Sequence, residues 1–568
     1  MKKGDKQRIS TAVLVAIAAS FPVSAPAQEQ KSAAAAQEGI GDIVVTAQRR
    51  EQNLQDVPVA VTAFSGETIA DLGIRSSADI ASVVPNLAIG LPGGEGNQPL
   101  IYIRGVGLAD FNSNNAGPNG VYVDEVYISS PGAQTFQLFD LDRVEVLKGP
   151  QGTLYGRNAT GGAINFITAK PSRDFQARAS LSYGSFDTIT GEAAIGGPIG
   201  DGVRFRLAGT GTHSDGYVRN LLTGRRENGQ GSFALRGQLA FDVADNFDAL
   251  LGVHGGRVDT RSPQFRSLGL LDPATGFSTP CALDAIRANQ CGNALGYVSP
   301  RRFHDGDYNK SEHLEVGNWG GAAHLNWRIG GVTLTSISAY DDVDKTHRED
   351  SDASPASLLE VDYHVRSKTF TQELRLSGSG GGVTWVAGGY YLHETLRQNQ
   401  TVDLFRELRF LVPDGGADTA GAATGGAPVL FARTINRQTT EAAALFGQVE
   451  VALTPALRAT LGGRYNHERK RFIATSQFEE DFIDGFAIPG GVLPLYVFDN
   501  RKTYDNVSFK IGLDYDIADD VMAYASISTG FKSGGFNGGF LSFDPAEAAV
   551  QAGPFEEETL TAYEIGLK

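Results

Sequence analysis

Hydrophobic and polar residues alternate along most of the chain beyond its first third. In the stretch SFALRGQLAFDV, Phe233 and Leu235 fall on one face of an extended strand, while Arg236 and Gln238 fall on the other. The stretch NVSFKIGLDYDI, residues 506–517, repeats this period of two. A strand with one apolar and one charged face needs either the core of a sandwich or lipid against its apolar side.

The connections between these strands distinguish the two alternatives. We count fourteen candidate strands, which begin near residues 177, 190, 203, 232, 247, 319, 332, 368, 383, 441, 457, 506, 521 and 559. Every second junction is a short polar turn, whereas alternate junctions are long, including residues 259–316, 397–440 and 470–505. Short turns at one end and long loops at the other are typical of outer-membrane barrels. We therefore predict an all-β, antiparallel transmembrane β-barrel over residues 171–568.

The N-terminus carries the pattern of an export signal. Four basic residues lie among the first eight, an apolar run covers residues 11–19, and Ala25-Pro26-Ala27 matches a cleavage site. Residues 1–27 are therefore predicted to be a signal peptide, and the Ala- and Gln-rich residues 28–41 a flexible leader. A transmembrane helix is the weaker alternative, because the apolar run is shorter than about 18 residues.

Residues 51–170 differ from the rest and are predicted to form a compact α+β segment. Two helices are expected, at residues 66–73 and 76–84, the second capped by Ser76 or Ser77. Strand-like runs follow at LIYIRGV, GVYVDEVYI and RVEVLKG. Large barrels of about 22 strands can hold a plug in the lumen, and this segment is a candidate for one.

Composition and candidate chemistry narrow the function further. The chain is 41% hydrophobic, has 70 glycines and carries a net charge of −16 with no basic patch, which argues against nucleic acid as a partner. Cys281 and Cys291 predict one disulfide in an oxidising compartment, with two free thiols as the alternative. No metal-ligand spacing and no nucleophile motif are present, so we expect no enzyme, no metal site and no cofactor.

Several motifs resemble those of TonB-dependent outer-membrane receptors. DIVVTAQRR, residues 42–50, resembles the TonB box. QDVPVAVTAFSGETI, IYIRGVG, GVYVDEVYI and RVEVLKGPQGTLYGRNATGGAINFITAKP resemble the plug domain, and FTQELRLSG, YASISTGFKSGGFN and LTAYEIGLK resemble barrel strands. The resemblance implies that residues 51–170 are the plug. It also implies a barrel of about 22 strands, so with fourteen candidates the chain is expected to be incomplete at its C-terminus.

The TonB box is expected to contact TonB through six residues, namely Asp42, Ile43, Val44, Val45, Thr46 and Ala47. Four of them are β-branched and follow a flexible leader, which suits addition of a strand to the exposed sheet edge of another protein. The alternative is that they form the first strand of the plug itself.

A latch between plug and barrel is implied by the resemblance. Alternation along KTFTQELRLSG and LTAYEIGLK places Glu373 and Glu564 on the lumen side. In the family such glutamates are thought to pair with basic plug residues, and Arg104 and Lys148 occupy the matching motifs. The alternative is that these charges simply line a wet wall.

Ligand contacts are expected at the Gly- and Asn-rich loops of the plug. The loop LADFNSNNAGPN offers Phe111, Asn112, Asn114 and Asn115 as candidates, with a plain flexible linker as the alternative.

Together, these features predict a TonB-dependent receptor in the outer membrane of a Gram-negative bacterium that imports a scarce ligand. A ferric siderophore or another iron complex is the leading candidate, with haem, cobalamin, oligosaccharides and small aromatic compounds as alternatives. Expected partners are TonB with its inner-membrane energising complex, outer-membrane lipid and the barrel-assembly machinery. A passive porin, a signalling receptor, an adhesin and a hydrolase are the rival interpretations.

Overall fold

A computed structural model describes residues 43–568, except residues 93–96, 111, 262–265, 294, 301, 405–430, 480–491, 519, 540 and 543. The predicted signal peptide, the predicted leader, Asp42 of the predicted TonB box and Phe111 of the predicted ligand loop lie outside the described residues. Within the described part of the chain, no helix combines the length and the apolar character that a membrane span requires.

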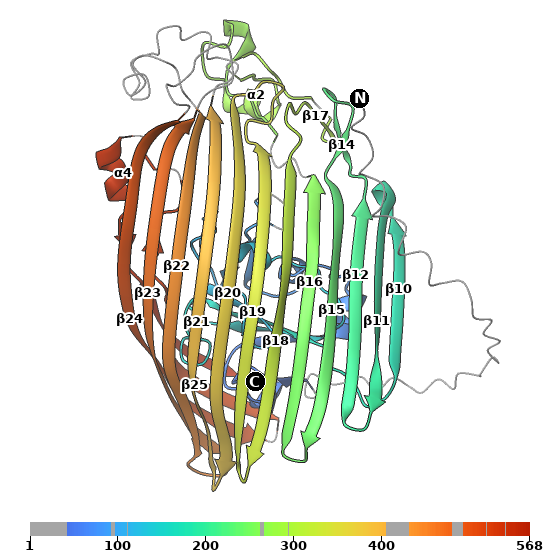
Figure 1. Cartoon of the computed structure of the whole chain (residues 1–568), viewed down its shortest axis with the longest axis vertical. Coiled ribbons are helices and arrows are strands. Elements are labelled where there is room, and N and C mark those ends of the chain that lie inside the picture. Colours follow the sequence, from blue (N-terminus) through green and yellow to red (C-terminus); the bar gives the residue numbers. More distant parts are fainter. Residues whose placement is uncertain are drawn as a thin grey trace, which may run out of the picture. The chain divides into compact units, whose positions relative to one another are not determined.

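Fourteen strands form one antiparallel sheet in chain order, the wall (Figure 1). This confirms the predicted transmembrane barrel fold. The wall strands are β10 (Gln176–Gly184), β11 (Thr188–Gly200), β12 (Val203–Ser214), β15 (Gly229–Ala244), β16 (Phe247–Arg261), β18 (His313–Ile329), β19 (Val332–Asp350), β20 (Leu359–Gly380), β21 (Val383–Leu404), β22 (Phe431–Ala452), β23 (Leu457–Glu479), β24 (Val492–Ala518), β25 (Val521–Lys532) and β28 (Glu558–Leu567).

Several wall strands are longer than the sequence pattern indicated. The strands β20 to β24 contain 22 to 27 residues each, whereas crossing a bilayer takes about 9–11. The predicted long junctions 397–440 and 470–505 are therefore partly wrong, since β21 extends to Leu404 and β24 begins at Val492. Alternation fades in stretches such as RQNQT because both faces of the strand are polar there.

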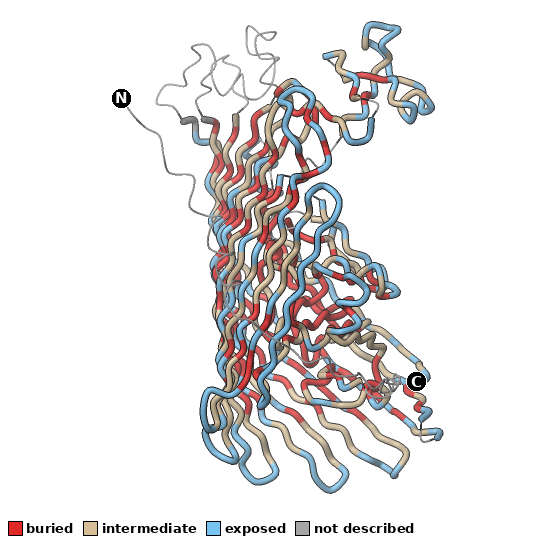
Figure 2. Tube along the Cα trace, turned by 90° about the vertical axis from the view of Figure 1, so that its right-hand side faces the viewer, coloured by how far each residue is buried: buried red, intermediate tan, exposed pale blue. Residues whose placement is uncertain are grey.

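The plug is built around a five-stranded sheet with the order β3-β8-β9-β6-β7. These strands are β3 (Val61–Ser65), β8 (Leu141–Lys148), β9 (Gly162–Thr168), β6 (Asn119–Val123) and β7 (Val126–Tyr127). A second pair, β4 (Leu87–Gly90) and β5 (Leu100–Ile103), lies beside it, and Ile103, Val144 and Ile164 are fully buried in the core between them. The plug packs against one face of the wall (Figure 2).

Of the two helices predicted in the plug, one forms as α1 (Gly66–Asp71), with the hydroxyl of Ser65 accepting the Thr68 amide. The other prediction is wrong, because residues 76–84 contain only a 3-10 turn at Asp79–Ser82 with no side-chain cap. Pro85 disfavours a helical Val84, and the Asp79 carboxylate instead accepts the backbone amides of Arg75 and Ser76.

Short elements lie in the connections between wall strands. They are β13 (Val218–Asn220), β14 (Arg226–Glu227), α2 (Leu283–Arg287), β17 (Asp305–Gly306), β26 (Gly535–Phe536), α4 (Pro545–Gln551) and β27 (Pro554–Phe555).

Candidate functional site

The predicted TonB box is docked in the plug. Val44 and Val45 form β1 (Val44–Val45), which pairs antiparallel with β2 (Gln52–Asn53). Val45 and Ala47 are buried in the cluster that joins plug and wall, whereas Val44 is 46% exposed. In this conformation the segment is the first strand of the plug, which was the alternative interpretation of its sequence.

One buried carboxylate holds this segment in place. Glu145 on β8 is fully buried and accepts the backbone amide of Thr46 at 2.7 Å and the Thr46 hydroxyl at 3.1 Å. The guanidinium of Arg143 donates to the same carboxylate at 2.9 Å, and the amide of Asn165 donates to it at 3.4 Å. Hydrogen bonds to an ionised acceptor are the stronger kind, so Glu145 is the anchor of the docked segment.

The second residue after the six predicted TonB contacts, Arg49, is also buried. Its guanidinium lies 4.5 Å from the centre of the Tyr155 ring and 5.2 Å from that of Tyr122. The same group lies 3.4 Å from Glu125 in the plug and 4.0 Å from Glu373 on β20. Arg49 thus contacts both the plug and the wall.

Arg375 on β20 completes this group of four charges. Its guanidinium donates to Glu125 at 2.7 Å and to Glu373 at 2.9 Å. Burial alone would raise the pKa of Glu125, but the guanidinium groups of Arg375 and Arg49 hold that pKa at about 2. Glu125 therefore stays ionised and bridges the plug to the wall over the physiological pH range.

Two further ion pairs join the plug to neighbouring strands. Arg50 pairs with Glu450 on β22 at 2.5 Å, and Arg157 pairs with Glu468 on β23 at 3.3 Å. Arg157 and Glu468 are both buried, so removal of Glu468 would leave the Arg157 guanidinium unpaired in the interior, whereas Glu468 also pairs with Lys470 on its own strand at 3.1 Å.

The four residues of the predicted latch do not form a single cluster. Arg104 donates to Glu564 on β28 at 2.7 Å, and the hydroxyl of Tyr524 donates to the same carboxylate at 2.7 Å. Glu373 instead contacts Arg375 and Arg49. Among the described residues, Lys148 makes no ion pair. The role of these contacts as a latch stays a prediction.

The asparagines of the predicted ligand loop are buried in contacts with their surroundings. Asn112 and Asn115 both donate to the carboxylate of Asp110. The side-chain amide of Asn114 donates to the carbonyl of Phe536, and the backbone carbonyl of Asn114 accepts Gln438 on β22 at 3.0 Å. These contacts fix the loop against the wall, and ligand contact there stays a prediction.

Cys281 and Cys291 are joined by a disulfide in the connection between β16 and β18. At the ends of β16 and β18 that flank this connection, the ligand atoms of Asp259, His313 and Glu315 all lie within 4.8 Å of one another. Sequence spacing gave no sign of this group, because it is assembled across more than fifty residues. The Arg257 guanidinium lies 2.8 Å from Glu315 and already supplies a positive charge there.

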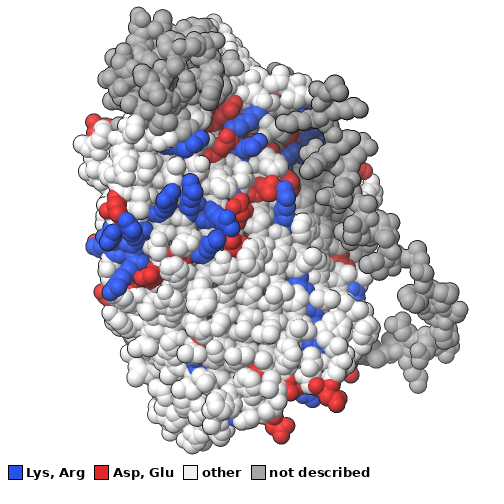
Figure 3. Space-filling view, viewed as in Figure 1, with Lys and Arg blue, Asp and Glu red and all other residues white. Residues whose placement is uncertain are grey.

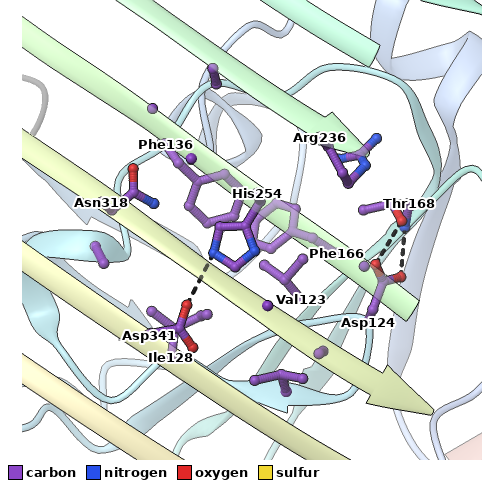
Figure 4. Close-up of a pocket in the computed structure, with 18 of the residues that line it drawn as sticks. Val123, Asp124, Ile128, Phe136, Phe166, Thr168, Arg236, His254, Asn318 and Asp341 are labelled. Carbon is purple, nitrogen blue, oxygen red and sulfur yellow. Dashed lines mark hydrogen bonds and ion pairs between the residues drawn. The ribbon is translucent and has the colours of Figure 1, made fainter. Parts of the chain in front are cut away.

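A cavity of about 170 Å³ separates the plug from β15, β16, β18 and β19 (Figure 4). Phe136 and Phe166 face it from the plug, while His254 and Asp341 face it from the wall and contact each other at 3.0 Å. This volume is below the range of about 300–1,000 Å³ typical of small-molecule sites. A large ligand cannot occupy this space unless the plug moves.

Comparison with known proteins decides the family. The family described as "TonB dependent receptor-like, beta-barrel" matches residues 269–568, and "TonB-dependent Receptor Plug Domain" matches residues 53–163. The chain belongs to the TonB-dependent receptor family. Members of this family lie in the outer membrane of Gram-negative bacteria, which confirms the predicted location.

The relatives of this receptor chain are named as transporters and receptors. The pesticin receptor of Yersinia pestis is 25% identical over 552 residues, which cover 94% of this chain and 69% of that receptor. A vitamin B12 transporter of Vibrio vulnificus strain YJ016 is 28% identical over 209 residues, which cover 36% of this chain and 33% of that transporter. The chain thus matches a third of the length of one relative and about two thirds of the other.

Among solved structures, the ferric yersiniabactin uptake receptor FyuA from Yersinia pestis superposes with a TM-score of 0.69 at 21% identity. The superposition covers 90% of this chain and 69% of FyuA. At this identity the likeness supports the fold.

Sequence reasoning missed most of the plug–wall contacts. Alternation correctly indicated that Glu373 faces the plug, but nothing local showed that Arg49, Glu125 and Arg157 would meet wall residues hundreds of positions away. The RVEVLK pattern around Glu145 predicts a strand, yet the anchoring role of this carboxylate depends on Thr46, which lies 99 residues earlier.

Proposed function

We propose that this chain is the receptor of a TonB-dependent uptake system for a ferric siderophore, with residues 1–27 as signal peptide, 28–41 as leader, 42–50 as TonB box, 51–170 as plug and 171–568 as barrel. The observation that carries the proposal is the docking of an extended β-branched segment into a plug that packs against the wall. The similar protein FyuA is a ferric yersiniabactin uptake receptor, which supports an iron complex as the ligand.

In the proposed cycle, ligand binding at the outer loops shifts the plug and weakens the contacts of Thr46 with Glu145. The segment from Ile43 to Ala47 is then released, and TonB pairs with it by strand addition. Work from the inner-membrane proton gradient next displaces the plug and admits the ligand. A passive porin, the main rival, would have neither a plug nor a use for this segment.

The free edge of β1 gives a selective test. The Leu54 amide donates to the Ile43 carbonyl at 2.8 Å, so the next pair along, Val44 with Asn53, is the one that exchanges no hydrogen bonds. The amide of Val44 therefore points away from β2. Val44→Pro removes this donor without removing a bond of the β1–β2 ladder.

We expect Val44→Pro to abolish uptake of a labelled ferric siderophore by cells that lack other receptors, while surface binding of the same ligand at 0 °C is unchanged. Val44→Thr keeps the amide and serves as the matched control, with uptake close to that of the parent. Uptake by Val44→Pro at the parental rate, or uptake that survives collapse of the proton gradient, would contradict the proposed function.

A further inference from the structure

The connection between β25 and β28 begins with a segment that lies against both the plug and the wall. We call this segment, residues 533–539 with the sequence SGGFNGG, the strap. Phe536 of the strap is fully buried, and its ring is stacked on that of Phe472 on β23 with 5.2 Å between the ring centres. Four of the seven residues are glycine, so the strap offers its neighbours mainly peptide groups.

Alternate carbonyls of the strap accept buried side-chain donors. Lys470 on β23 donates to the Gly534 carbonyl at 2.6 Å. The side-chain amide of Asn114 in the plug donates to the Phe536 carbonyl at 2.8 Å. Both donor residues are more than nine-tenths buried, so these hydrogen bonds are shielded from water.

The next carbonyl in this series, that of Gly538, accepts two side-chain amides. Gln398 on β21 donates to it at 3.1 Å, and Asn436 on β22 donates to it at 2.5 Å. Carbonyls of every second residue share one side of an extended chain. Donors from three wall strands and from the plug therefore converge on one side of an extended peptide.

Buried acceptors beside the strap are left without a donor. In the part of the chain that the structure describes, no hydrogen bond is made by the Oδ1 atoms of Asn114 and Asn436 or by the Oε1 atom of Gln438, whose Nε2 donates to the Asn114 carbonyl. A buried polar atom without a partner costs free energy. The strap occupies the donors of this region but not its acceptors, so a ligand with both carbonyls and N–H groups fits the region better.

The two faces of the same strands differ in their chemistry. Arg397 and Arg437 face outward, and Figure 3 shows basic side chains in blue on the outer surface over β20 to β24. Their neighbours Gln398 and Asn436 face inward and are neutral amides. A side-chain amide carries both donors and an acceptor, which matches the peptide group better than it matches a carboxylate or a phosphate.

We propose that the strap is an internal stand-in for the ligand, and that the site it covers binds a ligand whose framework carries amide groups. The inference rests on the proposed function and narrows the ligand to peptide-like iron complexes. Carbonyls of the ligand take Gln398 and Asn436 from the strap, and its N–H groups reach the three acceptors that the strap leaves unpaired. Strap and ligand compete for one place, so the chain itself opposes binding.

One added methyl group can open the site. A Cβ atom on Gly538 would lie 2.0 Å from Oδ1 of the buried Asn114, so Gly538→Ala should drive the strap from its place. The matched control is Gly463→Ala on β23, where the added methyl group meets no atom within 4 Å. Phe536→Ala opens the site by the opposite change, because it removes the ring that stacks on Phe472.

The probe is a fluorescein-labelled peptide with the strap sequence and blocked termini. Its binding to the purified full chain in neutral detergent micelles is measured by fluorescence polarisation. We expect Gly538→Ala and Phe536→Ala to bind it at least tenfold more tightly than the parent and Gly463→Ala, which keep the strap in place. An analogue with alkene groups in place of the amides that follow its second, fourth and sixth residues should bind the opened variants at least tenfold more weakly, because it lacks the three carbonyls.

Two iron complexes then test the class of ligand. The ferric complex of a cyclic hexapeptide with three hydroxamate side chains should displace the labelled peptide from Gly538→Ala. The ferric complex of acetohydroxamate has the same iron-binding groups but no peptide framework, so it should not displace the peptide at equal iron concentration.

Equal binding of the strap peptide by the parent, Gly463→Ala and both opened variants would overturn the proposal, as would equal binding of the peptide and its alkene analogue. Equal displacement by the two ferric complexes would overturn the assignment to an amide framework. Displacement by neither complex, with the peptide bound as expected, would support the amide site and contradict the iron complex of the proposed function. Circular dichroism checks the fold of each variant, and if one opened variant is misfolded, the other is judged by the same criteria.

Discussion

The two sides of the plug meet the wall in different ways. Towards β20–β23, ion pairs and hydrogen bonds, most of them buried, bind the plug to wall side chains that include Glu373, Arg375, Glu394, Gln438 and Glu468. Towards β15–β19, a cavity of about 170 Å³ intervenes, and ion pairs gather at its edge, where Arg236 contacts Asp140. The first side can separate only by exposing buried charges. The second side is tied in the same way where the buried Asp140 meets Arg206 on β12 and Arg236 on β15, but around the cavity it can widen at lower cost.

This difference indicates how the plug can be held firmly against one part of the wall and still change its packing against another part. A buried charge left without its partner costs several kcal/mol, so the contacts on the β20–β23 side set the register of the plug. Apolar surface around a small cavity carries no such penalty, and its packing can change by small steps. The four predictions that follow test this contrast.

The largest effect is expected from Glu468→Ala. The substitution leaves Arg157 buried without its carboxylate, which typically costs about 3–5 kcal/mol. Guanidinium unfolding of the purified chain in detergent, followed by circular dichroism, measures this loss. The double variant Arg157→Met/Glu468→Met should recover part of it, because the buried guanidinium is then gone as well. The recovery should stay partial, because Lys470, 3.1 Å from Glu468, still loses its carboxylate. Parental stability of Glu468→Ala would show that the β20–β23 side is not clamped.

Replacement of alanine by valine, which adds two carbon atoms, gives the next largest effect when it is made on each side in turn. Ala442 on β22 is packed against the plug, so Ala442→Val should destabilise the fold by about 1–3 kcal/mol through overpacking. Ala322 on β18 lines the cavity, so Ala322→Val should be neutral or stabilising by about 0.5–2 kcal/mol. The same unfolding assay compares them, and equal losses for both would remove the distinction between the two sides.

Acid should weaken the β20–β23 side in a defined range of pH. The pKa of Glu125 is lowered from its ordinary value of 4.5 to about 2, so its stabilising contribution is complete above pH 4.5 and is lost as the pH falls towards 2. We expect a contribution of about 1 kcal/mol, since solvent screens this partly exposed carboxylate. Thermal unfolding between pH 6 and pH 3 should show a smaller decline in Glu125→Gln than in the parent. Parallel declines would assign the acid sensitivity to other groups.

The smallest effect is expected at the predicted latch. Arg104 is 39% exposed where it meets Glu564, and ion pairs of this kind contribute about 0–1 kcal/mol. Arg104→Glu should therefore lower stability slightly but slow ligand uptake if the pair acts as a latch. The exchanged pair Arg104→Glu/Glu564→Arg should restore uptake. An Arg104→Glu variant with a tightly seated plug and parental uptake would count against the latch.

The wall strands could be predicted because the alternation that identifies each of them involves only neighbouring residues. The period of two, with Phe233 and Leu235 on one face of a strand and Arg236 on the other, indicates which face meets lipid. Turn residues mark where each strand ends. The upper parts of β21 and β22 escaped prediction because both of their faces carry polar residues. Inward-facing Gln398 and Asn436 are buried there and donate to the Gly538 carbonyl, so the hydrophobic alternation is lost.

The plug–wall contacts could not be predicted in the same way. Arg157 and Glu468 are more than three hundred residues apart, and their pairing depends on how two domains are placed. Arg104 and Glu564 could be paired in advance only because their motifs resemble those of known receptors. The docked position of Val45 was open from the sequence alone, since an extended β-branched segment fits either its own plug or the edge of another protein.

The hydrogen bonds of Thr46 have a mechanical consequence. β1 contributes two residue pairs to its ribbon, but the next residue is tied to Glu145 on β8, and β8 lies inside the five-stranded sheet between β3 and β9. A tensile load applied to the chain just before Thr46 therefore does not peel the plug from its rim. It is transmitted through one carboxylate to an interior strand, so the force at which the plug begins to yield is set by how firmly Glu145 holds Thr46.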